Sequence, residues 1–146
     1  DTVRGILDGH IVLTRSLAEQ SHYPAIDILT SVSRLMPHIT TIPHRAAADS
    51  LRRLAATFRS AEDLINIGAY TDGTNADIDR AKALMPQIRS FLIQTADEHC
   101  RWDDTIAHLH RLADQVDSHT PPPPHRQVGA TRPTLARQDT LSRTSR

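Results

Sequence analysis

The sequence has almost no lysine, and this absence excludes one common kind of functional site. Its single lysine, Lys82, lies between alanines with no glycine nearby. A phosphate-binding loop needs a lysine beside its glycines to hold the β- and γ-phosphates of a nucleotide. The sequence therefore contains no such loop, and we expect this chain by itself to be unable to hydrolyse ATP.

Cysteine and long apolar runs are also scarce. Cys100 is the only cysteine, so no internal disulfide can form and a reducing compartment is the default expectation. With no base partner in view, we interpret it as structural. No run approaches the 18 apolar residues that indicate a membrane-spanning helix.

Histidine is plentiful, with nine residues, but its spacing does not indicate a metal site. His108 and His110 are two positions apart on a predicted helix and so point to different sides. His99 and Cys100 are adjacent, with no second pair to complete a zinc site. We therefore expect no bound metal.

Charge is balanced overall but unevenly distributed. The formal net charge is zero, yet the residues from Ser118 onward contain five arginines and one acidic residue, which leaves an acidic body. A neutral chain with an acidic body lacks the basic charge that nucleic-acid-binding proteins carry. Residues 117–146 are polar, with four consecutive prolines, and are expected to be disordered because they cannot bury enough surface to offset their ordering entropy.

Residues 1–42 have a mixed pattern of short elements. The apolar run 11–13 follows an Asp-Gly turn signal and predicts a buried strand. Tyr23 precedes Pro24, which favours an extended backbone there. The other expected elements are helical turns at residues 16–20 and 31–36, the second ended by Pro37, and strand or loop at residues 25–28.

Residues 43–116 have the periodicity of three amphipathic helices, which predicts a small bundle. Pro43 suits the first turn of a helix, and Gly68 suits the position after its end. Pro86 is expected to kink or restart the second helix, and Thr95 with Glu98 has the spacing of a capping box. The three apolar stripes are Leu51, Leu54, Ala55, Phe58, Ala61 and Ile65; Ile78, Ala81, Leu84, Met85, Ile88, Phe91 and Leu92; and Trp102, Ile106, Leu109, Ala113 and Val116.

Five motifs extend over most of these two regions: DGHIVLTR (8–15), HYPAID (22–27), SVSRLMP (31–37), AEDLINIGAY (61–70) and IDRAKALMPQIRSFLIQ (78–94). They resemble the distal third of the flagellar and type III secretion export ATPases, which are relatives of the rotary ATP synthase α and β subunits. HYPAID followed by SVSR is the most specific part. The resemblance implies the end of a P-loop-type α/β domain (1–42), a C-terminal helical domain (43–116) and a tail (117–146).

The phosphate-binding loop of that family lies N-terminal to the matched segment. The sequence also opens on Asp1 rather than methionine. We therefore expect the chain to be a piece of a longer protein that binds ATP and Mg²⁺ mainly through its missing N-terminal part. Residues 1–42, without the sheet they would pack on, are expected to be marginally stable and to expose apolar surface.

Arg34 is the strongest catalytic candidate. The resemblance implies that the SVSR arginine is an arginine finger, which reaches the γ-phosphate held by the neighbouring subunit. A guanidinium suits this role because it is always charged and can bond two oxygens at once. From spacing alone, the alternative is a surface arginine near a short helix before Pro37.

Three further residues are implied to line the nucleotide. In related rotary β subunits an aromatic residue before the matching proline packs on adenine, which here makes Tyr23 and Pro24 candidates; the alternative is a core tyrosine. Trp102 corresponds weakly to a second adenine-lining aromatic. It also fits the apolar stripe of the third helix, which its spacing favours.

The resemblance implies a flagellum-specific or type III export ATPase that couples ATP hydrolysis in a homo-hexameric ring to protein secretion. It also implies a cytoplasmic location, peripheral at the inner-membrane export gate. The implied partners are a stalk-like coiled-coil protein, a regulatory protein and chaperone–substrate complexes, without nucleic acid. The alternatives are a non-catalytic helical interaction module and a rotary ATP synthase fragment. An α/β enzyme of another kind is disfavoured because Asp8, Asp27 and Asp63 form no recognisable catalytic pair.

Overall fold

The described part of the chain is mostly helical, and its strands form a small two-stranded sheet. A computed structural model describes residues 6–118, so most of the segment 117–146 for which disorder is expected lies outside the described residues. None of the described helices is long and apolar enough to cross a membrane. In chain order the elements are β1 (Gly9–His10), α2 (Arg15–Glu19), β2 (Val32–Ser33), α3 (Met36–Ile39), α4 (Ile42–Asn66), α5 (Ala76–Leu92) and α6 (Trp102–Asp117).

The helix α4 begins and ends where the sequence signals predict. The Thr41 hydroxyl accepts a hydrogen bond from the His44 N–H (3.4 Å), and Pro43 lies in the first turn. At the other end, Gly68 has φ +71° and its N–H donates to the Ile65 carbonyl (3.1 Å). A left-handed residue at this position is the usual end of a helix and favours glycine.

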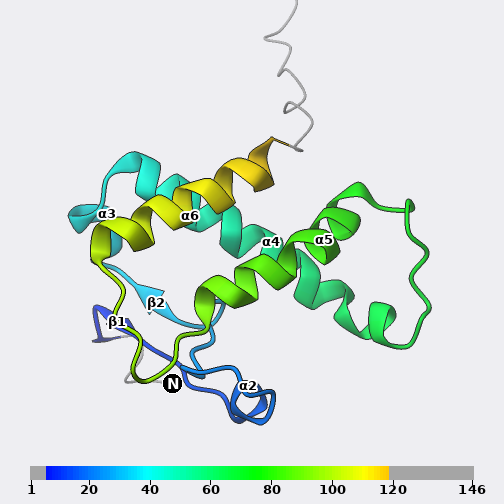
Figure 1. Ribbon diagram of the computed structural model, residues 1–146, viewed down its shortest axis with the longest axis horizontal. Coiled ribbons are helices and arrows are strands. Elements are labelled where there is room, and N and C mark those ends of the chain that lie inside the picture. Colours follow the sequence, from blue (N-terminus) through cyan, green and yellow to red (C-terminus); the bar gives the residue numbers. More distant parts are fainter. Residues whose placement is uncertain (1–5, 119–146) are drawn as a thin grey trace, which may run out of the picture.

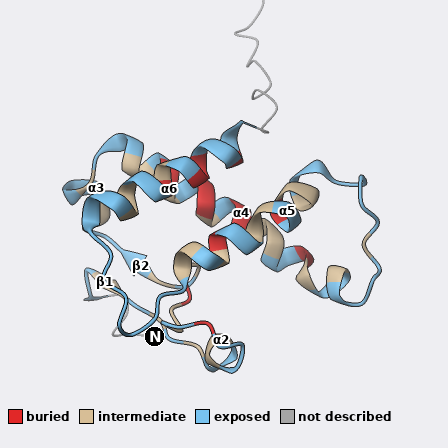
Figure 2. Cartoon of the chain, viewed as in Figure 1, coloured by how far each residue is buried: buried red, intermediate tan, exposed pale blue. Residues whose placement is uncertain are grey.

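The helix α4 forms the centre of the bundle and packs against both α5 and α6 (Figure 1). Buried residues gather where the three helices cross (Figure 2). Most of them come from the three predicted apolar stripes, which confirms the expected bundle, whereas Ala47 and Leu112 lie outside the predicted stripes. The core consists of Ala47, Leu51, Leu54, Ala81, Ile88, Leu109, Leu112, Ala113 and Val116, with Phe58, Leu84, Met85, Phe91 and Leu92 packed around it.

Two details of the bundle differ from expectation, and a third is tested only in part. The helix α5 continues through Pro86, so it does not restart there, and the alternative of a kink at Pro86 stays a prediction. Thr95 and Glu98 form a turn, not a helix start: the Glu98 carboxylate accepts a hydrogen bond from the Thr95 N–H (3.3 Å), but the next helix begins at Trp102. Trp102 is 67% exposed, so its assignment to the core is wrong. Trp102 is the first residue of α6.

The N-terminal segment, residues 6–41, lies along one side of the bundle (Figure 1). Its strands β1 and β2 pair antiparallel, with Gly9 opposite Ser33 and His10 opposite Val32. A Cβ on Gly9 would lie 2.7 Å from the Val32 carbonyl oxygen, so this close pairing requires glycine. The helical turn expected at residues 16–20 is present as α2.

Two expectations for this segment are wrong. Residues 31–36 do not form a helical turn ended by proline: they contain β2, and Pro37 lies inside the following helix α3. Residues 11–13 are not a buried strand, since Ile11 and Leu13 are 71% and 70% exposed. Within the described residues no layer covers this run, and the expectation of exposed apolar surface here is confirmed.

Candidate functional site

Arg34 lies directly after β2, at the exposed edge of the small sheet. Its backbone N–H donates to the Asp8 carbonyl oxygen (2.8 Å), which ties the residue to the segment before β1. The Ser33 hydroxyl, just before Arg34, accepts a hydrogen bond from the N–H of Met36, the first residue of α3 (3.2 Å). The backbone on both sides of Arg34 is thus fixed, and the residue is accessible to a neighbouring molecule.

Tyr23 and Pro24 are joined by a cis peptide bond in the loop after α2. Tyr23 is 55% exposed, which argues against a core tyrosine. Its carbonyl oxygen accepts a hydrogen bond from the Gln94 N–H (2.8 Å), so this loop is attached to the end of α5. Pro24 lines a cavity together with Phe91 and His108 of α5 and α6.

Trp102 is not among the residues that line that cavity. Its ring instead lies against His44 at the start of α4, with ring centroids 5.8 Å apart and a tilt of 53°. The four residues proposed from the sequence as catalytic or nucleotide-lining therefore do not converge on one cavity. All four are exposed: Tyr23, Pro24 and Arg34 lie on the N-terminal segment, and Trp102 is the first residue of α6.

The structure instead brings together polar groups around Asp27, at the junction of the N-terminal segment and the bundle. The Asp27 carboxylate is 8% exposed and accepts a hydrogen bond from the Arg59 guanidinium of α4 (2.9 Å). The same oxygen accepts from the N–H groups of Leu29 (2.9 Å) and Thr30 (3.3 Å). One carboxylate thus shapes the loop after HYPAID and attaches it to α4.

The pKa of Asp27 reflects two opposing effects. Burial raises the pKa, whereas the hydrogen bonds from Arg59 and from the Leu29 N–H lower it. The bonds outweigh burial, so the pKa of this carboxyl lies below its ordinary value. The group is therefore ionised at neutral pH and the ion pair with Arg59 is present.

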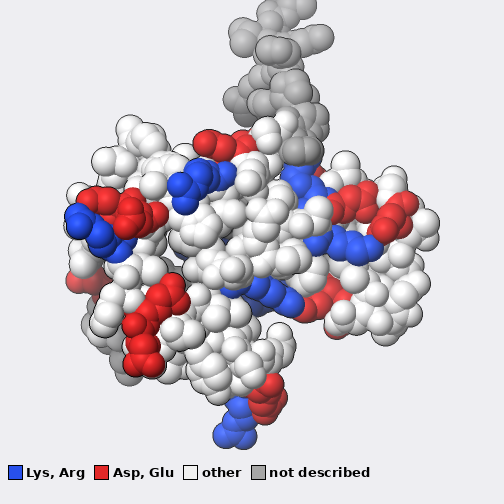
Figure 3. All heavy atoms as spheres, viewed as in Figure 1, with Lys and Arg blue, Asp and Glu red and all other residues white. Residues whose placement is uncertain are grey.

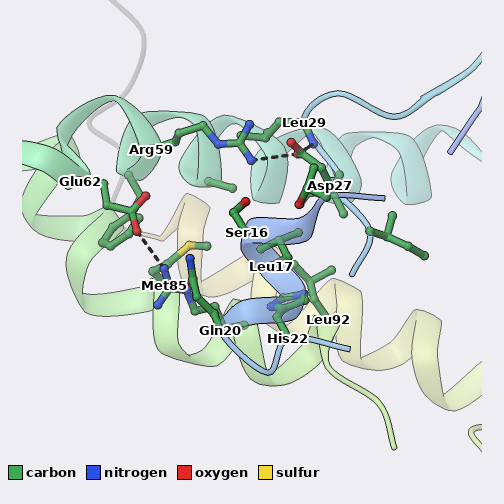
Figure 4. Close-up of a pocket in the computed structure, with 16 residues that line it drawn as sticks. Ser16, Leu17, Gln20, His22, Asp27, Leu29, Arg59, Glu62, Met85 and Leu92 are labelled. Carbon is green, nitrogen blue, oxygen red and sulfur yellow. Dashed lines mark hydrogen bonds and ion pairs between the residues drawn. The ribbon is translucent and has the colours of Figure 1, made fainter. Parts of the chain in front are cut away.

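Beside this pair lies a cavity of about 390 Å³ between α2, α4 and α5 (Figure 4). Arg59 reaches toward Asp27 at one end, and at the other Glu62 accepts a hydrogen bond from Arg89 of α5 (3.2 Å). The Arg89 guanidinium also lies 5.4 Å from the centroid of the Phe58 ring. The charges that line this cavity are thus paired with one another.

His22 is buried in the wall of the same cavity, with 8% of its surface exposed. Burial lowers the pKa of His22 below its ordinary value, and the nearby positive charge of Arg89 lowers it further. The imidazole is therefore held neutral, packed beside α2 (Figure 4).

We expect protonation of His22 to oppose folding. Because its pKa is lower in the folded chain, the unfolded chain binds the proton more tightly. The free energy of unfolding should therefore fall as the pH drops from 7 toward 5, through the unfolded pKa of about 6.5. Urea unfolding at several pH values measures this dependence. His22→Gln, which cannot titrate, should reduce it; an unchanged pH dependence in the variant would contradict the assignment.

Charged side chains of both signs alternate on the surface. On the face shown in Figure 3, the described basic groups lie singly or beside acidic ones.

Within residues 6–118, no three His, Cys, Asp or Glu side chains come together in a way that could hold a metal ion. Cys100 is exposed and lies outside the core; a hydrogen bond with the Glu98 carboxylate raises the pKa of its thiol.

Comparison with known proteins gives matches along most of the described chain. The family model for the ATP synthase alpha/beta family, nucleotide-binding domain, matches residues 1–33, and the model for the T3SS EscN ATPase C-terminal domain matches residues 40–111. The flagellum-specific ATP synthase of Bacillus subtilis is 49% identical over 112 residues, which are 77% of this chain and 26% of that protein. The SPI-2 type 3 secretion system ATPase of Salmonella typhimurium is 47% identical over 112 residues, 77% of this chain and 26% of that protein.

A solved structure shows the same arrangement. The assembled ATPase EscN from the type III secretion system of enteropathogenic E. coli matches with a TM-score of 0.72 and 43% identity, over 76% of this chain and 27% of that one. EscN in complex with its central stalk EscO matches with the same TM-score and identity, over 77% and 28% of the two chains.

The fold and the matched segments place this chain in the class of ATP synthase-like ATPases. Within that class, it belongs to the family of flagellar and type III secretion export ATPases, and corresponds to their C-terminal part. It spans about a quarter of the length of the curated relatives it matches.

Proposed function

We propose that this chain is the C-terminal part of an ATPase that assembles into a hexameric ring and drives protein export by a flagellar or type III secretion system. In this assembly Arg34 supplies an arginine finger to the ATP site of the neighbouring subunit. The observation that carries the proposal is the exposed position of Arg34 at the end of β2, with its backbone bonded to Asp8. The sequence match to secretion ATPases gives this position its context.

The chemistry of Arg34 suits phosphoryl transfer. Negative charge spreads over the oxygens of the transferred phosphoryl group in the transition state, so a positive group placed there lowers the barrier more than it aids binding. A guanidinium can bond two of these oxygens at once without losing its charge. Because the described residues contain no phosphate-binding loop, Arg34 would serve a nucleotide held by other residues, together with Mg²⁺.

Tyr23, Pro24 and Trp102 are proposed to lie near the adenine side of a nucleotide. The rings of Tyr23 and Trp102 are exposed, and an aromatic ring can stack on a flat base. Of the three residues, Trp102 has the weakest support, because its ring already packs against His44. These positions remain a proposal for the assembled protein.

The exposed apolar side chains of the N-terminal segment support the place of this chain in a larger protein. Ile6, Ile11 and Leu13 are each at least 70% exposed, and in the full-length ATPase they would pack against the rest of the nucleotide-binding domain. A stalk in the ring is proposed from the EscN–EscO complex. A regulatory protein, chaperone–substrate complexes and a place at the inner-membrane export gate follow from the family resemblance.

The rival function is a helical interaction module without a part in catalysis. A mixing experiment with the full-length ATPase separates the two. Subunits with Arg34→Ala and subunits that lack the phosphate-binding lysine are each expected to be inactive alone. Mixed rings should regain part of the ATP turnover, because some interfaces then combine an intact Arg34 with an intact phosphate-binding loop. No recovery in mixed rings, with assembly confirmed by light scattering, would contradict a finger that acts across the subunit boundary.

A further inference from the structure

The loop that leads to Arg34 is attached to the helical bundle at two points. Asp27 begins this loop and accepts a hydrogen bond from Arg59 of α4 (2.9 Å). Ser31 ends it, and its carbonyl oxygen accepts a hydrogen bond from Arg52 of the same helix (3.2 Å). Arg52 and Arg59 are seven residues apart, which is two helical turns, so they lie on one face of α4.

The loop between these two points is internally stiff. The Ser31 hydroxyl donates to the Asp27 carbonyl oxygen (2.7 Å) and accepts from the Val12 N–H (3.0 Å). The Ser31 N–H donates to the same Asp27 carbonyl (3.0 Å), and the Asp27 N–H donates to the Val12 carbonyl (2.9 Å). A displacement of α4 would therefore move residues 27–31 together instead of being absorbed within the loop.

Arg34 follows this loop directly. Only Val32 and Ser33, the two residues of β2, separate Ser31 from Arg34, and β2 is paired with β1. The path from α4 to Arg34 thus runs through paired or hydrogen-bonded backbone. Catalytic groups must be placed within a fraction of an ångström, and a displacement of 1 Å can lower a rate about 100-fold.

The ion pair contributes little to stability by itself, because the Arg59 side chain is 50% exposed and water screens the attraction. We propose that Arg59, together with Arg52, is a positioning residue: it holds the Asp27–Ser31 loop against α4 and so couples the position of the helical bundle to that of Arg34. This inference rests on the proposed role of Arg34 in turnover. The inference is confined to these contacts: the bonds from Arg59 to Asp27 and from Arg52 to Ser31 fix where the chain enters β2 before Arg34.

The test is a double-mutant cycle in the full-length, assembled ATPase. Arg59→Met is expected to lower kcat for ATP about tenfold, with KM changed less than twofold, since the loop is loosened but the nucleotide-binding residues are intact. Arg59→Lys should restore part of kcat. In the Arg34→Ala background, Arg59→Met should have no further effect, because there is no arginine left to misplace.

Two variants keep the test independent of folding. Asp27→Asn retains an oxygen for the Leu29 and Thr30 N–H groups but loses the charged partner of Arg59, and should lower kcat as Arg59→Met does. Arg53→Met removes an arginine of the same helix that bonds Ser50 in the bundle, and should leave kcat within twofold. All rates are measured on rings isolated by size exclusion.

The possible results separate this proposal from the proposed function. If Arg34→Ala lowers kcat strongly while Arg59→Met and Asp27→Asn do not, the positioning role is wrong and the finger stands. If the effects of Arg59→Met and Arg34→Ala multiply, Arg59 acts independently of Arg34 and the proposal is also wrong. If Arg34→Ala leaves kcat within threefold, the finger itself fails, and the positioning role with it.

Discussion

Replacement of Arg34 by alanine is expected to lower ATP turnover of the full-length, assembled protein by about 10³-fold, the lower end of what arginine fingers contribute. ATP binding should change by less than threefold, because the guanidinium acts chiefly on charge that develops in the transition state. The location of the Arg34 side chain explains why so large an effect is expected. Arg34 is exposed at a sheet edge while its backbone is fixed by the hydrogen bond to Asp8 (2.8 Å).

Single-turnover hydrolysis and equilibrium binding of a fluorescent ATP analogue measure the two quantities separately. Arg34→Lys keeps the charge but loses the two-pronged geometry, and should remain well below the unaltered protein. Arg111→Ala removes an exposed arginine from α6 and should have no effect. Turnover of the Arg34→Ala variant within threefold, a change of only about 0.7 kcal/mol in barrier, would show that Arg34 is an ordinary surface residue.

The helical half of the fold could be predicted from the sequence because its signals are local. Apolar residues at helical spacing determine which face of each helix is buried, and the ends of α4 are marked by Thr41, Pro43 and Gly68. The same reasoning failed for Thr95 and Glu98. Their spacing suits a helix start, and one of the two capping-box hydrogen bonds forms, from the Thr95 N–H to the Glu98 carboxylate. The next helix nevertheless begins only at Trp102.

The N-terminal segment could be predicted only in part, because its structure depends on contacts that are distant in sequence. The run 11–13 is apolar enough for a buried strand, yet within the described residues nothing covers it. Residues 32–33 form a strand because they pair with residues 9–10, a contact that local helix signals do not contain. Here tertiary pairing determined the structure, and propensity did not.

The candidate site was also only partly visible in the sequence. Motif resemblance predicts Arg34, Tyr23 and Pro24 as site residues, whereas the Asp27–Arg59 ion pair is not predicted. Asp27 enters the prediction only as a possible catalytic carboxylate. An aspartate followed by a turn commonly accepts hydrogen bonds from the next backbone N–H groups, and this signal was available. Asp27 and Arg59 are 32 positions apart in the sequence, which made their contact unpredictable.

The stability of the bundle depends strongly on Ile88, and Ile88→Ala is expected to destabilise the chain by about 3 kcal/mol. Ile88 is 1% exposed, and Ala81 is the only other fully buried residue of α5. The substitution would thus remove most of the larger of the two buried side chains of α5. Closely packed neighbours from three helices relax only partly, so a cavity should remain and add to the lost transfer free energy.

Ile67→Ala is the matched control, since it makes the same change at a residue that is 74% exposed. It should alter the free energy of unfolding by less than about 0.5 kcal/mol. Urea unfolding followed by far-UV circular dichroism suits both variants, because the only tryptophan, Trp102, is 67% exposed and reports poorly on the core. Equal effects of the two substitutions would mean that α5 is not anchored through Ile88. A loss confined to Ile88→Ala would show that the buried side chain of Ile88 holds α5 in the core against α4 and α6, the packing that gives α4 a fixed position in the bundle.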